Sequence, residues 1–176
     1  GASSLMEAPA DGISLDDFQI ISKMLMEAGA NITELNTVRG CLSQIKCGGL
    51  RRKCGGATVV VSTISDVLGN PLEIIGSGPW VDAQPDFDAA ELILKRYGLI
   101  DGVSEAVWKR IHSKPAPVSN HPNVQHIILG DINTAIDAAM HKADLLGYET
   151  TTLSRNLTGD ARSVGETLGS MALELL

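Results

Sequence analysis

Residues 124–153 read VQHIILGDINTAIDAAMHKADLLGYETTTL, and this stretch decides the fold class of the chain. Val124 to Leu129 is a short apolar run that predicts a strand, and Gly130-Asp131 separates it from a helical pattern. Tyr148 to Leu153 predicts another strand. Because strands alternate with helices, the sequence predicts an α/β fold with a parallel sheet, in a Rossmann-like three-layer architecture. The helix between the two strands is expected to be buried through Ile136, Ala139, Met140, Ala143 and Leu146.

The first half of the chain shows the same alternation. Ala57 to Ile64, with the sequence ATVVVSTI, is β-branched and nearly continuously apolar, which predicts a strand covered on both faces. The proline-rich residues 113–123, SKPAPVSNHPN, are the predicted linker. Four helices are predicted in this half. The first begins after Ser14, has Asp17 at its N3 position and ends at Gly29, and the second begins near Thr33. The other two run from Phe87 to Arg96 and from Val103 to His112.

Composition and charge narrow the classes of function. With 176 residues, of which 44% are hydrophobic, the chain is long enough to bury a core. Its net charge of −7 argues against a general nucleic-acid binder, because such proteins need basic surface. No apolar run approaches the ~20 residues that span a bilayer, so no membrane partner is expected. Small molecules are left as the expected partners, and a homo-oligomer is compatible with the sequence.

The three cysteines predict the compartment. Cys41, Cys47 and Cys54 are odd in number, whereas secreted disulfide frameworks usually have even counts, and metal sites usually show tighter pairs. We therefore expect free thiols in a reducing compartment, with the cytosol or the mitochondrial matrix both suitable.

A polar stripe is predicted on the second helix. Asn36, Arg39, Ser43 and Lys46 follow one another at offsets of three, four and three, so helical geometry would set them in a row. The planar guanidinium and the compact ammonium suit an anionic ligand. A solvated helix face would explain the same pattern. The helix is expected to end at Gly48-Gly49, which would either let backbone approach a ligand or serve as a plain C-cap.

Three loops hold further candidates for a site. Asp66, which follows the first strand, is a candidate metal ligand or general base, or else a loop carboxylate that caps backbone. The run Gly76-Ser77-Gly78-Pro79 could form an anion nest from successive N–H groups, or only a tight turn. Gly130-Asp131 opens a helix whose N–H groups could face a phosphate, while Asp131 would suit a ribose hydroxyl, a metal or a helix cap.

The order of several short segments resembles a known family, the class II glycerate 2-kinases. This resemblance covers almost the whole chain. It implies an enzyme that moves the γ-phosphoryl group of ATP to the 2-hydroxyl of D-glycerate with Mg²⁺, in the cleft between two α/β lobes. The matching segments are Ser3-Ser4-Leu5, Asn36-Thr-Val-Arg39, Leu42-Ser-Gln-Ile-Lys46, Ile64-Ser-Asp-Val67, Glu73-Ile-Ile-Gly-Ser-Gly-Pro79, Arg96-Tyr-Gly98 and Gly159-Asp-Ala-Arg162.

The resemblance also implies roles for single residues and a division of the chain. Lys46, Arg39 and Asp66 would be catalytic, with Asp66 as metal ligand or base. Residues 1–112 would be the latter part of the first lobe, 113–123 its hinge, and 124–176 the start of the second lobe, so the chain alone is expected to be weakly active or inactive. Ser3 and Ser4 would belong to the family's anion loop. Together with the residue patterns above, this gives Ser3, Ser4, Asn36, Gly48, Gly49, Ser77 and Gly78 as expected contacts of substrate or phosphate, and Gly130 and Asp131 as expected contacts of the nucleotide.

The chain departs from the family pattern at several positions, which leaves a second hypothesis open. Gly40 stands where the family often has Lys, Asn70 where it often has Asp, and Trp80 where it usually has Thr, while Asp131-Ile132 replaces Ser-Asn. A non-catalytic homologue, or a binding and assembly module of the same fold, would show such changes. An unrelated nucleotide-binding α/β domain is the third hypothesis.

Overall fold

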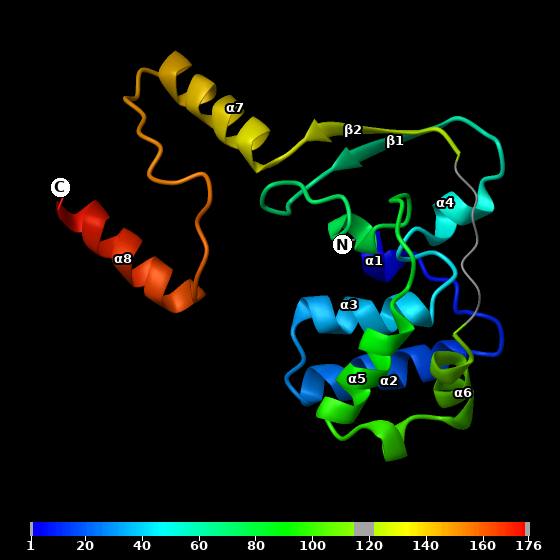
Figure 1. Ribbon diagram of the computed structural model, residues 1–176. Helices are drawn as coiled ribbons and strands as arrows, with labels where there is room; N and C mark the ends of the chain where they lie inside the picture. The colour runs from blue at the N-terminus through cyan, green and yellow to red at the C-terminus, as the bar shows by residue number, and fades with distance from the viewer. Residues whose placement is uncertain (1, 115–121, 175–176) are drawn as a thin grey trace. The chain divides into compact units, whose positions relative to one another are not determined.

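The computed structural model describes residues 2–114 and 122–174, without the side chains of residues 2 and 4. Two compact units divide the chain, Gly1–Leu129 and Gly130–Leu176. The first unit contains the helices α1 (Ala2–Leu5), α2 (Leu15–Glu27), α3 (Ile32–Cys41), α4 (Gly49–Lys53), α5 (Phe87–Arg96) and α6 (Glu105–Ser113), the short 3₁₀ turns η1 (Ile75–Ser77) and η2 (Ile100–Gly102), and the strands β1 (Val59–Ile64) and β2 (Val124–Gly130) (Figure 1).

Reciprocal side-chain caps start α2 and α3 of the first unit. At α2, the hydroxyl of Ser14 accepts from the Asp17 amide, and the Asp17 carboxylate accepts from the Ser14 amide, each at 3.0 Å. Asn31 and Glu34 make the same reciprocal pair at α3. These caps satisfy amides that have no partner within the helix, which is why both helices begin there. The predicted start of α2 at Ser14 is confirmed, and the predicted bounds of α5 match the structure.

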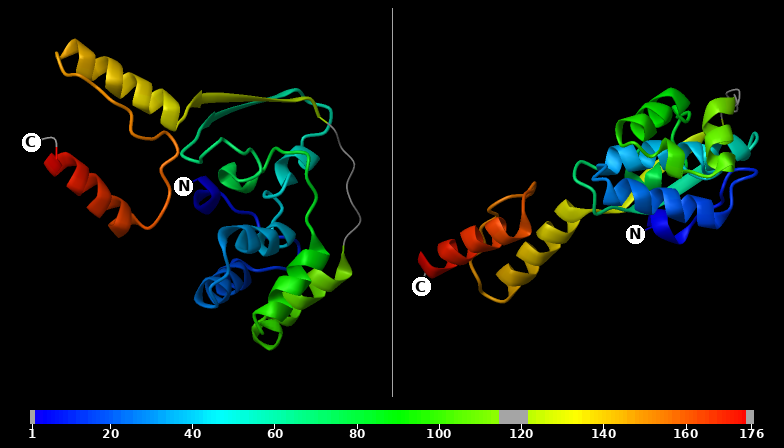
Figure 2. Two further views of the ribbon diagram at one scale, coloured as in Figure 1. Left: turned by 60° about the vertical axis from the view of Figure 1, so that its left-hand side comes forward. Right: turned by 90° about the horizontal axis from the view of Figure 1, so that it is seen from below.

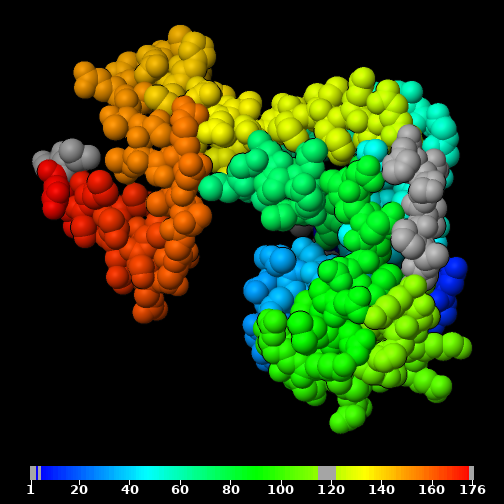
Figure 3. All heavy atoms as spheres, viewed as in Figure 1, coloured from blue at the N-terminus to red at the C-terminus, as the bar shows by residue number. Residues whose placement is uncertain are grey.

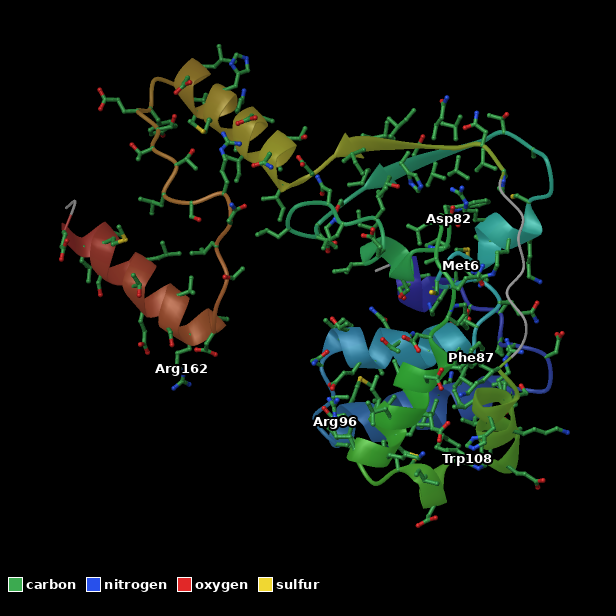
Figure 4. The ribbon with its side chains drawn as sticks, viewed as in Figure 1. Met6, Asp82, Phe87, Arg96, Trp108 and Arg162 are labelled. Carbon is green, nitrogen blue, oxygen red and sulfur yellow. The ribbon has the colours of Figure 1, made fainter. Side chains whose placement is uncertain are left out.

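Four of these helices enclose the core of the first unit. Phe18, Ile21 and Leu25 on α2 are buried at spacings of three and four, as their pattern predicts. In the space-filling view α3 and α5 pack against each other as one body (Figure 3). The two helices are also joined at one end, where Arg96 of α5 (Figure 4) pairs with Glu34 at 2.6 Å. Other core side chains are Leu35 and Val38 of α3, Ala90 and Leu94 of α5, and Val107 and Ile111 of α6.

The two strands form a parallel pair, which confirms the predicted α/β class. Both arrows point the same way (Figure 1), and the Val59 amide donates to the Asn123 carbonyl at 2.8 Å. The prediction that β1 is covered on both faces is wrong for the described residues. Its side chains alternate between half-buried and exposed, and Ile64 is 81% exposed. The helices of this unit lie on one side of the pair in Figure 1 and in the left view of Figure 2, and the side chains of β1 alternate between half-buried and exposed, so only that face is covered.

The second unit contains α7 (Ile132–Leu145) and α8 (Ala161–Glu174). Gly147 has a φ of 83° just beyond α7, where a left-handed residue ends many helices. The predicted burial of α7 through Ile136 and its neighbours is wrong, because α7 has no buried residue. The strand predicted at Tyr148 to Leu153 does not form either. A strand needs a partner for its backbone groups, and the described part of this unit offers none.

The predicted division of the chain at residues 112 and 124 stays a prediction. Most of the predicted linker, residues 115–121, lies outside the described residues. Residues 124–129 pair with β1 and therefore group with the first unit. Within residues 2–114 and 122–174, none of the helices has the length and apolarity needed to cross a membrane.

Truncation of Leu94 tests this description of the core. Leu94 is fully buried on α5, so Leu94→Ala should lower the free energy of unfolding by about 2–5 kcal/mol, through lost contacts and the cavity that remains. The matched control is Leu92→Ala on the same helix, where the side chain is exposed. Chemical denaturation of both variants checks the difference. Equal losses in the two variants would contradict the assigned burial.

Candidate functional site around Lys46

The predicted polar stripe does not lie on one helix. α3 ends at Cys41, with Leu42 as its C-cap, so Ser43 and Lys46 lie beyond it. The Leu42 carbonyl accepts from the Ala10 amide and the Gln44 amide donates to the Ala8 carbonyl, each at 2.7 Å. Because these groups bond to residues 8–10, they are unavailable to continue the helix. The helical period was therefore the wrong reason to group the four polar residues.

Lys46 is nevertheless at the centre of a buried polar cluster. Its side chain is 1% exposed. The ammonium donates to the carbonyl of Ser3 at 2.7 Å and to the hydroxyl of Ser3 at 3.0 Å. Its third neighbour is Glu7, whose Oε2 lies 3.3 Å from Nζ. A lysine ammonium has three N–H groups, of which two donate to Ser3, and the third direction is taken by the ion pair with Glu7.

Glu7 is the member of this cluster that sequence reasoning missed. Its Oε1 accepts from the hydroxyl of Ser43 at 2.6 Å and from the Ala8 amide at 2.9 Å. The Ser43 hydroxyl in turn accepts from the amides of Ile45 and Lys46, each at 3.1 Å. Glu7 is 39 positions from Lys46 and belongs to no short motif. The proximity of Ser3 and Ser4 was the only signal in the sequence that could have pointed to it.

A row of hydroxyl groups leads from Lys46 to α3. The hydroxyls of Ser3 and Ser77 are 2.6 Å apart, and the Ser77 hydroxyl donates to Oδ1 of Asn36 at 3.3 Å. Since a hydroxyl has one proton, Ser77 accepts from Ser3, and the row runs in one direction from Lys46 through Ser3 and Ser77 to Asn36. The structure thus brings together Lys46, Ser3, Ser77 and Asn36, all predicted as site residues. The side chain of Ser4 lies outside those described.

The turn that holds Ser77 is not the predicted anion nest. Gly76, Ser77 and Gly78 have φ values of 60°, 64° and 59°. The amides of Ser77 and Gly78 donate to the carbonyls of Ile74 and Ile75, so neither points at a ligand. The tight-turn interpretation is therefore the correct one. A direct role of Gly78 toward substrate stays a prediction.

Gly48 and Gly49 join this turn to the neighbouring loop. Gly48 is left-handed, with a φ of 74°, and stands before α4 instead of ending the second helix as predicted. Its amide donates to the Gly78 carbonyl at 2.6 Å, and the Gly49 amide donates to the Lys46 carbonyl at 3.0 Å. A Cβ atom on Gly49 would lie 2.3 Å from the Gln44 carbonyl oxygen. Both glycines thus permit close backbone approach within the protein, and their role toward phosphate stays a prediction.

Arg39 adds a second cation to the cluster. Its guanidinium lies 5.2 Å from the centre of the Phe18 ring, and its buried Nε has no hydrogen-bond partner among the described residues. Burial lowers the pKa of Arg39, against the opposing effect of Glu7. Burial also lowers the pKa of Lys46, with Arg39 adding to the effect and Glu7 opposing it. Two cations facing one carboxylate leave an excess of positive charge, which suits an anion.

Two cavities adjoin the Ser77 turn. One of about 230 Å³ is lined by Asn36, Cys47, Glu73 and Ser77 together with apolar and threonine side chains. Another of about 320 Å³ is lined by β1, by His126, and by Gly76, Pro79 and Trp80. The row of hydrogen-bonded side chains from Lys46 reaches the cavity of about 230 Å³, because Asn36 and Ser77 belong to the row and also line that cavity. It is large enough for a small polar molecule.

The remaining predicted residues are Asp66 in the first unit and Gly130 and Asp131 in the second. Asp66 is exposed directly after β1, and its proposed role as metal ligand or base stays a prediction. No group of three or more His, Cys, Asp or Glu that could hold a metal occurs among the residues that the structure describes. In the second unit, Asp131 caps α7 by accepting from the amide and the hydroxyl of Thr134 at 2.8 and 2.9 Å. The cap interpretation of Asp131 is confirmed, and nucleotide contact by Gly130 or Asp131 stays a prediction.

Comparison with known proteins gives consistent matches. The model of a family described as "Domain of unknown function (DUF4147)" matches residues 1–112. A glycerate kinase of Danio rerio is 38% identical over 181 residues, which cover 98% of this chain and 36% of that protein. A glycerate 2-kinase of Pyrococcus horikoshii is 34% identical over 99% of this chain and 41% of that protein. The chain thus spans well under half the length of the curated relatives it matches.

A solved structure agrees with these matches. The crystal structure of a glycerate kinase from Thermotoga maritima has a TM-score of 0.83 and 33% sequence identity to this chain. The match covers 99% of this chain and 41% of that one.

Substitution of Gly49 tests the packing of the two loops. Gly49→Ala would place a methyl group against the Gln44 carbonyl, so the backbone must shift, at a cost of about 1–3 kcal/mol in the free energy of unfolding. Gly56→Ala is the matched control, because nothing lies within 4 Å of the Cβ position there. Thermal or chemical denaturation compares the two. A Gly49→Ala variant as stable as Gly56→Ala would mean that the loops do not approach as described.

Proposed function

The chain belongs to the DUF4147 family, and we propose that it forms part of a glycerate 2-kinase, which transfers the γ-phosphoryl group of ATP to the 2-hydroxyl of D-glycerate. Support comes from the relatives named glycerate kinase, which match along nearly the whole chain, and from the chemistry of the cluster around Lys46. Both substrates of this reaction are anions. Catalysis of phosphoryl transfer depends mainly on positioning and on charge neutralisation.

The excess of positive charge around Lys46 is the observation on which the proposal rests. Lys46 and Arg39 share one carboxylate, that of Glu7, although the whole chain has a net charge of −7. Burying two cations with one acid is unfavourable unless an anion compensates them. The carboxylate of D-glycerate or the transferred phosphoryl group would provide that compensation.

The geometry suggests different roles for the two cations. Arg39 has a buried N–H without a partner among the described residues, so we propose that it contacts the anion directly. The N–H groups of Lys46 already face Ser3 and Glu7, so Lys46 contributes charge and orients Ser3. Asn36 lines the cavity of about 230 Å³, and the row of hydroxyls that begins at Lys46 ends at Asn36. We therefore propose the cavity lined by Asn36 and Ser77 for D-glycerate, with their polar groups toward its hydroxyls.

Mg²⁺ belongs to the proposal as the ion that neutralises charge on the ATP phosphates. Mg²⁺ is usually held by one or two carboxylates together with substrate phosphates, so a single carboxylate from this chain suffices. Asp66, exposed at the end of β1, is the residue that we propose for it. Gly130 and the amides that begin α7 are proposed to contact the nucleotide. Gly48, Gly49 and Gly78 then support the site through the loop contacts described above.

The compartment is proposed from cysteine chemistry. Cys41, Cys47 and Cys54 are free thiols in the structure, as predicted. Free thiols persist in a reducing environment, and we propose the cytosol.

The assay that tests the proposal is ATP-dependent phosphorylation of D-glycerate by the full-length protein. ³¹P NMR of the product should show 2-phosphoglycerate, which distinguishes transfer to the 2-hydroxyl from transfer to the 3-hydroxyl. A folded protein without turnover would contradict the kinase proposal and favour the non-catalytic homologue.

Replacement of Lys46 tests the proposed anion site. In the full-length protein, Lys46→Met removes a buried charge while keeping an unbranched side chain of similar length, so kcat/KM should fall on the order of 100-fold or more. The control is Lys23→Met, because Lys23 is exposed on α2 and pairs only with Glu27 in the described contacts. It should keep normal kinetics. Normal kcat/KM in a folded Lys46→Met protein would show that the anion site is placed wrongly.

A further inference from the structure

We propose that Glu7 is the positioning residue of the site: its carboxylate holds the Lys46 ammonium in place against Ser3 and so sets the direction of the hydroxyl row that leads to Asn36. No sequence motif singles Glu7 out, and it lies outside the cavity lined by Asn36 and Ser77. Its effect on that cavity is exerted through Lys46 and Ser3.

The two oxygens of Glu7 have separate tasks. Oε1 accepts from the Ser43 hydroxyl and the Ala8 amide, which fixes the carboxylate to both neighbouring segments. Oε2 is buried and has no hydrogen-bond partner of ordinary geometry among the described residues, and the Lys46 ammonium at 3.3 Å is its counterpart. The side chain of Glu7 is 11% exposed. Water can therefore replace it at Lys46 only if the cluster opens.

Glu7 is also the group that favours a charged Lys46. Burial and the neighbouring Arg39 both lower the pKa of Lys46, and Glu7 is the opposing influence. Among the described residues, Ser3 and Glu7 contact the ammonium, and Arg39 is the other charged group that influences it. Without the Glu7 charge, a buried ammonium beside a guanidinium would lose its compensation, so Lys46 would deprotonate more readily or move toward solvent. Ser3 would then lose the donor that orients its hydroxyl.

The consequence for turnover rests on the proposed function. If the hydroxyl row orients D-glycerate, loss of the Glu7 charge should lower kcat/KM for glycerate about tenfold or more, similar to the loss of residues that orient metal ligands, which typically costs about 10–100-fold. The KM for ATP should change little, because the inferred contact is with the acceptor.

Three variants of the full-length protein separate the effect of the Glu7 charge from the effects of side-chain size and of the position of the carboxylate in the chain. Glu7→Gln keeps the length of the side chain and an acceptor for the Ser43 hydroxyl but removes the charge. Glu7→Asp keeps the charge on a shorter side chain and should restore part of the effect. Glu34→Gln is the matched control, because Glu34 is 12% exposed and pairs with Arg96 at 2.6 Å away from Lys46.

Two measurements are made on each variant. Amine-reactive labelling read by mass spectrometry reports the reactivity of Lys46, with the exposed Lys23 as internal reference. Steady-state kinetics report kcat and KM for D-glycerate and ATP. We expect Lys46 to resist labelling in the wild type and in Glu34→Gln, to label at least severalfold faster in Glu7→Gln, and to give an intermediate rate in Glu7→Asp.

The outcomes distinguish this inference from the proposed function. Unchanged labelling of Lys46 in Glu7→Gln would overturn the inference, whatever the turnover. Faster labelling with normal kcat/KM would overturn the link between Glu7 and the reaction. A wild-type protein without turnover would refute the kinase proposal, and the labelling would still decide whether Glu7 holds Lys46. If Glu7→Gln does not fold, the Glu7→Asp variant provides the test. Lys46 that labels as slowly in Glu7→Asp as in the wild type, in a protein of lowered stability, would mean that Glu7 has only a structural role.

Discussion

The buried charge of Lys46 is the constraint on which this site depends. An ammonium with 1% exposure must find its partners inside the protein, since water cannot reach it. Ser3 and Glu7 supply those partners, and both come from the first residues of the chain. The segment around α1 is therefore held against the turn that follows α3. Ser77 joins the same arrangement through Ser3, so the three segments are positioned together.

Such an arrangement contributes more to position than to stability. Replacing a buried ion pair by apolar residues is often neutral or stabilising, whereas removal of one partner costs about 3–5 kcal/mol. The ion pair between Lys46 and Glu7 thus adds little to the free energy of unfolding, but substitution of either residue alone is expected to disturb the arrangement of the segments. Arg39 adds a second positive charge, and Glu7 is the carboxylate that acts on it among the described residues. A positive charge that is half-buried and not fully compensated is unfavourable for folding, but it favours the binding of an anion.

Local patterns were sufficient to predict α2 and α5, and long-range contacts explain why the predicted end of the second helix was wrong. Ser14 with Asp17, and the apolar spacing from Phe18 to Leu25, determine α2 within one segment, so the sequence predicts it correctly. The stripe from Asn36 to Lys46 contained members of the actual cluster, yet the helix ends at Cys41 because residues 8–10 bond to the backbone of Leu42 and Gln44. Glu7 belongs to no motif and its side-chain partners are 36 and 39 positions away, so its closeness to Ser3 and Ser4 was the one hint of its role in the sequence. Burial of β1 and α7 was overestimated because apolar composition does not reveal which face receives a partner.

A double-mutant cycle on the free energy of unfolding tests the central claim most directly. Glu7→Gln, Lys46→Met and the combined variant are compared with the wild type by chemical denaturation. If the two side chains depend on each other as described, the combined loss should be smaller than the sum of the single losses by about 0.5–3 kcal/mol. Additivity within about 0.5 kcal/mol would contradict the claim that Glu7 and Lys46 hold these segments together.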